Sequence, residues 1–223
     1  SVFESGMYKG MQGADVQKGN FLMFFNDKRR FKKYLLSILI GLPTWYVVGI
    51  LIMFSREFGK AFGIAEEINP GKGVMFAYLP ISIGDILIGL LSQVLKSRKK
   101  ALYVFYAITV LAIVLYFMQT GGSANNMYMI CALLGFGTGF WAIFVTMGAE
   151  QFGTNLRATA ATTIPNMVRG ALVGIAFLFE WLQDSFSYIN AGIITGIVVM
   201  AISITAVSMI DETFDKDLDF YEK

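Results

Sequence analysis

The chain has 223 residues, of which 56% are hydrophobic and only 15% are charged, with a mean hydropathy of +0.60 and a formal net charge of +2. Soluble domains carry about 25% charged residues, and a water-soluble fold of this length could not bury so much apolar surface. Histidine is absent, and Cys131 is the only cysteine. We therefore expect a lipid-embedded protein without disulfides, metal or cofactor. We do not expect an enzyme, because the usual histidine-based nucleophile pairs and metal ligands are missing.

Six apolar stretches of roughly 20 residues each are long enough to cross a bilayer as helices. Their apolar runs are continuous and do not alternate, which favours helices over a β-barrel. The predicted fold class is therefore an all-α membrane protein, with a transmembrane domain at 34–210 between an N-terminal segment, 1–33, and an acidic tail, 211–223. The predicted spans are Tyr34–Phe54, Gly73–Leu95, Ala101–Met118, Met127–Gly148, Ala158–Phe179 and Tyr188–Ile210.

Lysine and arginine are distributed unevenly between the two sides of the predicted spans. Fourteen lie on the side that holds both chain ends, whereas Arg56, Lys60 and Lys72 lie on the other side. Because cytoplasmic loops carry the excess of basic residues, we predict a multi-pass protein of the plasma (inner) membrane with both ends in the cytoplasm. The acidic tail is expected to be solvated.

The segment Asn20–Lys33 (NFLMFFNDKRRFKK) mixes aromatic residues with a basic cluster directly before the first predicted span. Such a sequence is typical of an interfacial helix that lies on the inner leaflet against anionic headgroups. A plain basic flank that only fixes the topology would have the same composition. Both interpretations are open at the level of sequence.

Four short segments with motif-like spacing occur along the chain, one near its start, two at the ends of predicted spans and one after the last span. The third has the most specific pattern, because an acidic residue, an aromatic residue, a threonine and an arginine recur at fixed offsets. The segments are Glu4-Ser5, Gly89–Ser92 with the bases that follow it, Glu150–Arg157, and Glu212-Thr213 with Leu218-Asp219.

In this order, the four segments resemble motifs of the major facilitator superfamily of transporters: P-E-S, G-x-L-S-D-R-x-G-R-R, E-x-F-P-T-x-x-R and P-E-T...L-E. The chain departs from the family pattern at Gln93, where the family has Asp, at Lys96, where it has Gly, and at Gly153, where it has Pro. The resemblance covers the whole chain and implies helices seven to twelve of a twelve-helix transporter. It implies two inverted three-helix repeats and a substrate site near the midplane, shared with an N-terminal six-helix half that is missing here.

The same resemblance implies that the first, second, fourth and fifth spans line the cavity. It also implies that Glu150, Arg157 and Arg98 form a charge network that latches a cytoplasmic gate. Ordinary interfacial charge is the alternative explanation for these three residues.

Asp85 and Arg169 are the ionisable side chains inside the predicted spans, apart from tyrosine and cysteine. A charge near the bilayer centre costs about 3 kcal/mol or more, so such residues usually face the bundle interior and have a function. We expect Arg169 to bind an anionic group of the substrate, and Asp85 to carry a coupled proton or to pair with Arg169. The alternative is a structural ion pair. Arg169 follows Arg157 by 12 residues, a spacing found in the organic-anion transporters and aromatic-acid:proton symporters that this segment resembles.

Three further residues are candidates for substrate contact. Asn166 shares a helical face with Arg169, and Trp45 and Tyr46 follow a proline in the middle of the first span. Trp141 could stack on a ring, although a single aromatic residue in an apolar span is more often part of the packing.

The predicted function is transmembrane transport of a small organic anion, such as a carboxylate metabolite, by alternating access coupled to protons. The partners would be the lipid bilayer, the N-terminal half and the substrate, and no nucleic acid. One alternative is a sugar or drug transporter of the same superfamily. Sugars are disfavoured because the hexose porters carry G-P-x-P-W where this chain has Gly137-Thr138-Gly139-Phe140-Trp141. An alternative of another class is a non-transporting membrane scaffold or receptor.

Overall fold

The computed structural model describes residues 18–222, and within this range all regular secondary structure is helical. Glu4-Ser5 of the first motif-like segment lies outside the described residues, as do Lys9 and Lys223, two of the fourteen basic residues counted above. Six helical stretches are long and apolar enough to cross a membrane, which confirms that part of the predicted fold class. These stretches are Lys28–Ile52, Pro70–Val94, Arg98–Phe117, Ala124–Glu150, Thr154–Gln183 and Tyr188–Met209.

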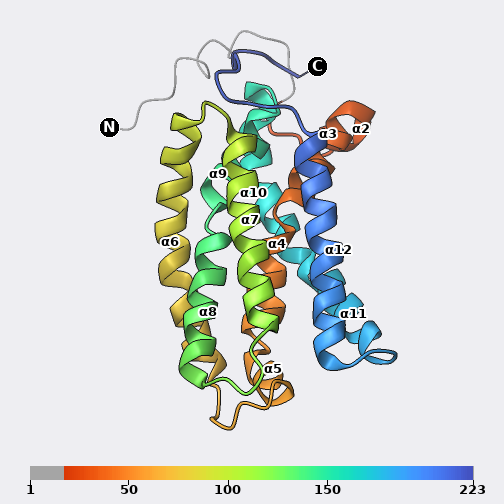
Figure 1. Cartoon of the computed structure of the whole chain (residues 1–223). Helices are drawn as coiled ribbons and strands as arrows, with labels where there is room; N and C mark the ends of the chain where they lie inside the picture. The colour runs from red at the N-terminus through yellow and green to blue at the C-terminus, as the bar shows by residue number, and fades with distance from the viewer. Residues whose placement is uncertain (1–17, 223) are drawn as a thin grey trace.

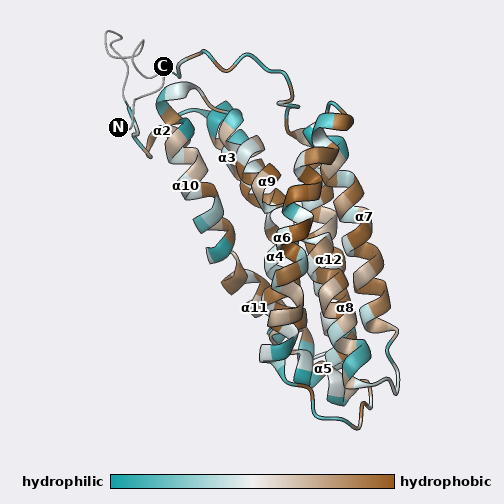
Figure 2. Ribbon diagram, turned by 90° about the vertical axis from the view of Figure 1, so that its left-hand side faces the viewer, coloured by the Kyte–Doolittle hydropathy of each residue, from teal (hydrophilic) through white to brown (hydrophobic). Residues whose placement is uncertain are grey.

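The six stretches pack side by side into one bundle (Figure 1). The start of α3 (Lys28–Ile40) and the tail after α12 (Tyr188–Met209) lie at one end, and α5 (Ser55–Ala61) lies at the other. We refer to these as the tail end and the α5 end. In Figure 2, the ribbon of α10 (Thr154–Gly170) carries hydrophilic residues partway along the bundle, whereas α12 is mostly hydrophobic. The fifth span is therefore the most polar of the six.

The first span begins earlier than its hydropathy predicted. From residue 18 on, it is preceded by a single helical turn, α2 (Met23–Asn26), and α3 starts at Lys28 and not at Tyr34. Asp27 is the N-cap of α3, and its carboxylate accepts hydrogen bonds from the backbone N–H groups of Arg29 (2.9 Å) and Arg30 (3.0 Å). The hydrogen bonds from Arg30 and Arg29 hold the pKa of Asp27 below its usual value. The basic cluster thus forms the first turns of the same helix that continues into the first candidate span.

The first span is irregular in its middle. After α3 come α4 (Leu42–Tyr46) and a π-helical segment, η2 (Val47–Ile52). Pro43 has no N–H to donate to the carbonyl of Leu39, and the hydroxyl of Ser203 donates to that oxygen instead, at 2.8 Å. Because an unsatisfied carbonyl is costly in lipid, this contact from α12 stabilises the proline break.

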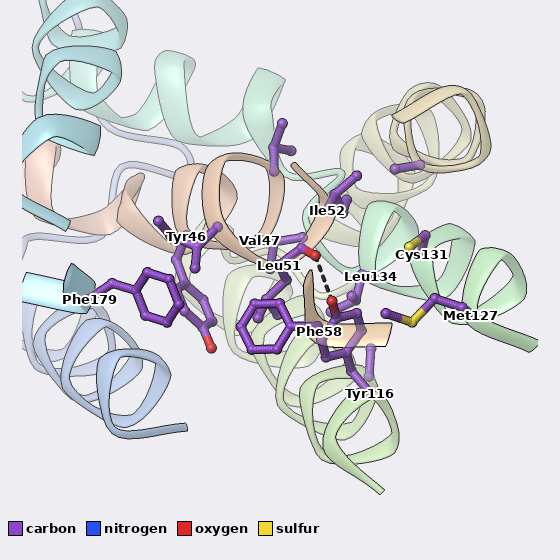
Figure 3. Close-up of a cluster of buried hydrophobic side chains, with 14 of the residues drawn as sticks. Tyr46, Val47, Leu51, Ile52, Phe58, Tyr116, Met127, Cys131, Leu134 and Phe179 are labelled. Atoms are coloured by element: carbon purple, nitrogen blue, oxygen red, sulfur yellow. Dashed lines mark hydrogen bonds between the residues drawn. The ribbon is translucent and has the colours of Figure 1, made fainter. Parts of the chain in front are cut away.

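Two buried tyrosines of α7 (Arg98–Phe117) satisfy further carbonyls of the first span. The hydroxyl of Tyr106 donates to the carbonyl of Ile40 at 2.6 Å, just before the break. The hydroxyl of Tyr116 donates to the carbonyl of Leu51 at 2.6 Å, within η2 (Figure 3). Both contacts hold the interrupted first span against α7.

The fourth span is also interrupted, between α8 (Ala124–Gly137) and α9 (Trp141–Glu150). Here the chain packs directly on α6 (Pro70–Val94): a Cβ added to Gly139 would lie 2.7 Å from the Cα of Gly84. A Cβ added to Gly135 would lie 2.2 Å from the carbonyl oxygen of Ala77. Small residues therefore let the two backbones touch, as is common between membrane helices.

The fifth span consists of α10 and α11 (Leu172–Gln183), which are separated at Ala171. Pro165 lies inside α10, and the helix continues past it to Gly170. The side chain of Arg169 lies in the last turn before the interruption.

Candidate functional site

A cavity of about 220 Å³ lies between the first, second, fourth and fifth spans. These are the four spans that the family resemblance implies for the cavity wall. Its polar lining residues are Thr44, Tyr78, Asp85, Thr138 and Arg169, and its apolar lining residues are Trp45, Val48, Ile81 and Trp141. A larger hollow of about 430 Å³ lies between α7 and α12, but its lining consists of Gly196 and apolar side chains, which suits lipid better than a polar solute.

Arg169 is the positively charged residue in the lining of this cavity. One guanidinium nitrogen donates to the side-chain oxygen of Asn166 at 3.3 Å, and the guanidinium carbon lies 5.6 Å from the ring centroid of Trp45. None of the four ion pairs within residues 18–222 includes Arg169. The arrangement orients the guanidinium through a cation–π contact and a hydrogen bond while its charge is not neutralised by a carboxylate.

Asp85 is engaged by the start of α9. Its carboxylate accepts a hydrogen bond of 2.9 Å from the backbone N–H of Ala142, the second residue of that helix. A carboxylate is favourable there because the first N–H groups of a helix lack partners and the helix dipole is positive at this end. In the described part of the chain, Asp85 makes no direct ion pair with Arg169. Asp85 therefore caps the interrupted fourth span from α6.

Two indoles lie beside these charged groups. The rings of Trp45 and Trp141 meet edge to face, with centroids 6.3 Å apart and an interplanar angle of 78°. Trp141, which the sequence favoured as a packing residue, is in the lining of the cavity because it is the first residue after the interruption. Gly137, at the end of α8, and Gly139, inside the interruption, were the available signal in the sequence.

Asn166 and Tyr46 are close in sequence to the lining residues Arg169 and Trp45 but do not line the cavity themselves. The side-chain oxygen of Asn166 accepts the hydrogen bond from Arg169, so Asn166 orients that side chain. Tyr46 is fully buried in the apolar cluster shown in Figure 3, and its hydroxyl donates to the carbonyl of Gly192 at 2.8 Å. Tyr46 therefore joins the first span to α12.

At the tail end of the bundle, Arg98 and Glu150 form a bidentate ion pair. The distances are 2.7 Å from Nε to Oε2 and 2.7 Å from Nη2 to Oε1, and the side chains are only 15% and 10% exposed. Arg98 is the first residue of α7 and Glu150 the last of α9. The contact thus fixes α9 to α7 with two charge-assisted hydrogen bonds.

Arg157, the third predicted member of this network, is bonded elsewhere. Its guanidinium donates to the carbonyl of Leu218 in the tail. The backbone N–H of Thr154 likewise donates to the carbonyl of Phe220 at 2.8 Å, and Asn155 exchanges two hydrogen bonds with Glu222. The structure therefore brings Arg98 and Glu150 together and places Arg157 against the tail. The tail is hydrogen-bonded to the start of α10, while most of its acidic side chains stay exposed.

Glu212 binds the same tail to α7. Its carboxylate accepts hydrogen bonds from the backbone N–H groups of Arg98 (3.0 Å) and Lys99 (3.2 Å) and from the hydroxyl of Ser97. Burial would raise the pKa of Glu212, but the hydrogen bonds from Ser97 and from the N–H groups of Phe214, Arg98 and Lys99 hold it below its usual value. Glu212 is therefore an N-terminal cap of α7 that is supplied from the tail.

Comparison with known proteins does not identify a family for this chain. No protein-family model matches the chain, and no curated protein matches it. The family resemblance therefore stays a prediction that rests on the four short segments and their order.

Proposed function

We propose that this chain is the C-terminal half of an alternating-access transporter for small organic anions, with transport coupled to protons. The observation that carries the proposal is Arg169. Its guanidinium borders a cavity, is oriented by Asn166 and Trp45, and has no carboxylate within ion-pair distance in residues 18–222. A planar guanidinium held in this way matches a carboxylate by two parallel hydrogen bonds.

The arrangement of interrupted helices supports the transporter part of the proposal. In an inverted-repeat transporter of six spans, the first and fourth spans occupy equivalent positions in the two repeats. Both are interrupted in this chain, between α3 and α4 and between α8 and α9. Interrupted helices in equivalent positions are a pointer to a substrate site, and the cavity lies beside both interruptions.

Helix α9 would couple the cavity to the cytoplasmic gate. Its first turn is capped by Asp85 beside the cavity, and its last residue, Glu150, is paired with Arg98. The helix is about 15 Å long at 1.5 Å per residue. A proton on Asp85 would weaken the cap, and α9 would then transmit the change to the Arg98–Glu150 ion pair. In this proposal, Arg98 and Glu150 form the gate and the bound tail supports it.

The direct test is uptake by liposomes that contain the full-length transporter. Radiolabelled monocarboxylates, sugars and organic cations are compared with and without an inward proton gradient. The proposal expects carboxylate uptake that the gradient accelerates, with little sugar or cation uptake. Uptake restricted to uncharged or cationic compounds would refute the substrate class, and carboxylate uptake that ignores the gradient would refute the proton coupling.

A further inference from the structure

The cavity wall contains two buried hydrogen-bond donors whose partners are missing from the described part of the chain. These are the hydroxyl of Thr44 and the indole N–H of Trp45. Thr44 is only 8% exposed, and both residues line the cavity next to Arg169. Buried polar groups are almost always hydrogen-bonded, and an unpaired one in a native protein calls for an explanation.

The hydroxyl of Thr44 does not donate to either of the carbonyls that a helical threonine normally uses. A helical threonine normally donates to the carbonyl four residues earlier, which for Thr44 is Ile40. That carbonyl already accepts the hydroxyl of Tyr106 at 2.6 Å. The carbonyl three residues earlier, that of Gly41, accepts the backbone N–H of Thr44.

Thr138 provides a comparison within the same cavity. It also lines the wall, but its hydroxyl donates to the carbonyl of Leu134 at 3.0 Å and to that of Gly135 at 3.1 Å. Thr138 is therefore satisfied by its own helix, whereas Thr44 is not. Of these two threonines, only Thr44 has a donor left for another molecule.

The rest of the wall adds charged donors and aromatic rings to these two neutral donors. Arg169 supplies charged donors, Thr44 and Trp45 supply neutral ones, and the carboxylate of Asp85 is engaged by Ala142. Trp141 adds a second aromatic ring at the same wall. An anion that also carries a second acceptor oxygen would give both the charged donor and the two neutral donors a partner.

We infer that the substrate is an oxygenated carboxylate: a small monocarboxylate that carries a hydroxyl or keto oxygen as a second acceptor. This inference rests on the proposed function. Arg169 binds the carboxylate, and Thr44 and Trp45 donate to the second oxygen. Thr44 and Trp45 are then the residues that select oxygenated substrates, because an analogue that lacks the oxygen leaves their buried donors unpaired.

Matched ligand pairs test the inference on the purified full-length transporter. Equilibrium binding is measured for lactate against propionate, 3-hydroxybutyrate against butyrate, and 4-hydroxybenzoate against benzoate. In at least one pair we expect the oxygenated member to bind about tenfold more tightly, the order of one buried hydrogen bond. Thr44→Val, which keeps the size and removes the hydroxyl, should bring that ratio close to one, mainly by weakening the oxygenated ligand. Thr44→Ser should restore the preference.

Trp45→Phe keeps a ring beside Arg169 but removes the N–H, so it should reduce the same ratio and serves if Thr44→Val does not fold. Thr195→Val is the matched control, because Thr195 is fully buried but its hydroxyl already donates to the carbonyl of Ala191 at 2.8 Å. This control should leave the ratio unchanged. Equal binding within every pair, or a preference that survives both Thr44→Val and Trp45→Phe, would overturn the inference while the binding of carboxylates at Arg169 still stood. If Arg169→Gln left carboxylate binding intact, the proposed function itself would fail.

Discussion

The ion pair between Arg98 and Glu150 is predicted to contribute far more to stability than an exposed ion pair of the same chain. Glu150→Gln would leave the guanidinium of Arg98 without its counter-charge in an environment where the two side chains are only 15% and 10% exposed. Breaking such a pair from one side costs about 3 kcal/mol or more. For a protein of this size, that corresponds to a fall of roughly 6–12 °C in Tm.

The measurement is thermal unfolding of the purified protein in detergent, for Glu150→Gln, Arg98→Gln and the double variant. The double variant should lose clearly less than the sum of the two single losses, because the second substitution removes a charge that is already unpaired. The control is Arg56→Gln at the opposite end of the bundle. Its ion pair with Glu67 is 47% and 74% exposed, so it should cost about 1 kcal/mol or less. The reasoning is refuted if Glu150→Gln lowers Tm no more than Arg56→Gln does, or if the two single losses simply add.

Asp85→Ala should accelerate hydrogen exchange of the Ala142 amide because it removes the cap of α9. Asp85→Asn keeps an acceptor, so its exchange rate should lie between those of Asp85→Ala and the wild type. Equal exchange rates in all three proteins would exclude the cap. For Glu212, the pKa is lowered in the folded state from a value of 4.5, so its stabilising contribution is present above pH 4.5 and is lost as the pH falls through the folded-state pKa. The difference in Tm between the wild type and Glu212→Gln should therefore be constant from neutral pH to about 5 and shrink at lower pH, and a difference that grows on acidification would contradict this. Gly139→Ala should destabilise by about 1–3 kcal/mol because its Cβ would meet the α6 backbone. Gly174→Ala, where a Cβ would meet nothing within 4 Å, is the control in Tm measurements, and equal effects of the two would argue against the close contact.

The six spans could be predicted from the sequence because an apolar run of bilayer length has few alternatives to a helix. The two charged residues within the spans could be predicted to face the bundle because a charge in lipid is costly, and Asp85 and Arg169 both border the cavity. The interruption of the fourth span could not be located from Gly137 and Gly139 alone, because such small residues also occur where uninterrupted membrane helices pack closely. It depends on the contact of Gly139 with α6 and on the cap from Asp85, and both are tertiary contacts.

The two residues Trp45 and Tyr46 show why neighbours in sequence differ in the structure. Both follow the same proline, but one borders the cavity and the other is buried against α12. Which side of the first span faces the cavity depends on the break at Pro43 and on η2, and the hydropathy pattern predicts neither. The hydrogen bonds of the tail could not be predicted, because an acidic composition is the same whether a carboxylate is only solvated or, like that of Glu212, also caps a neighbouring helix.

Arg169 tests the central claim most directly, because the proposal assigns its guanidinium to the carboxylate of the substrate. The measurement is uptake of a radiolabelled monocarboxylate by liposomes containing the full-length transporter, with Arg169→Lys and Arg169→Gln compared with the wild type. Lysine keeps the charge but loses the planar fork, so Arg169→Lys should transport with a raised KM, whereas Arg169→Gln should show no uptake above empty liposomes. Normal carboxylate uptake by a correctly folded Arg169→Gln variant would contradict the account and leave Arg169 with a structural role only.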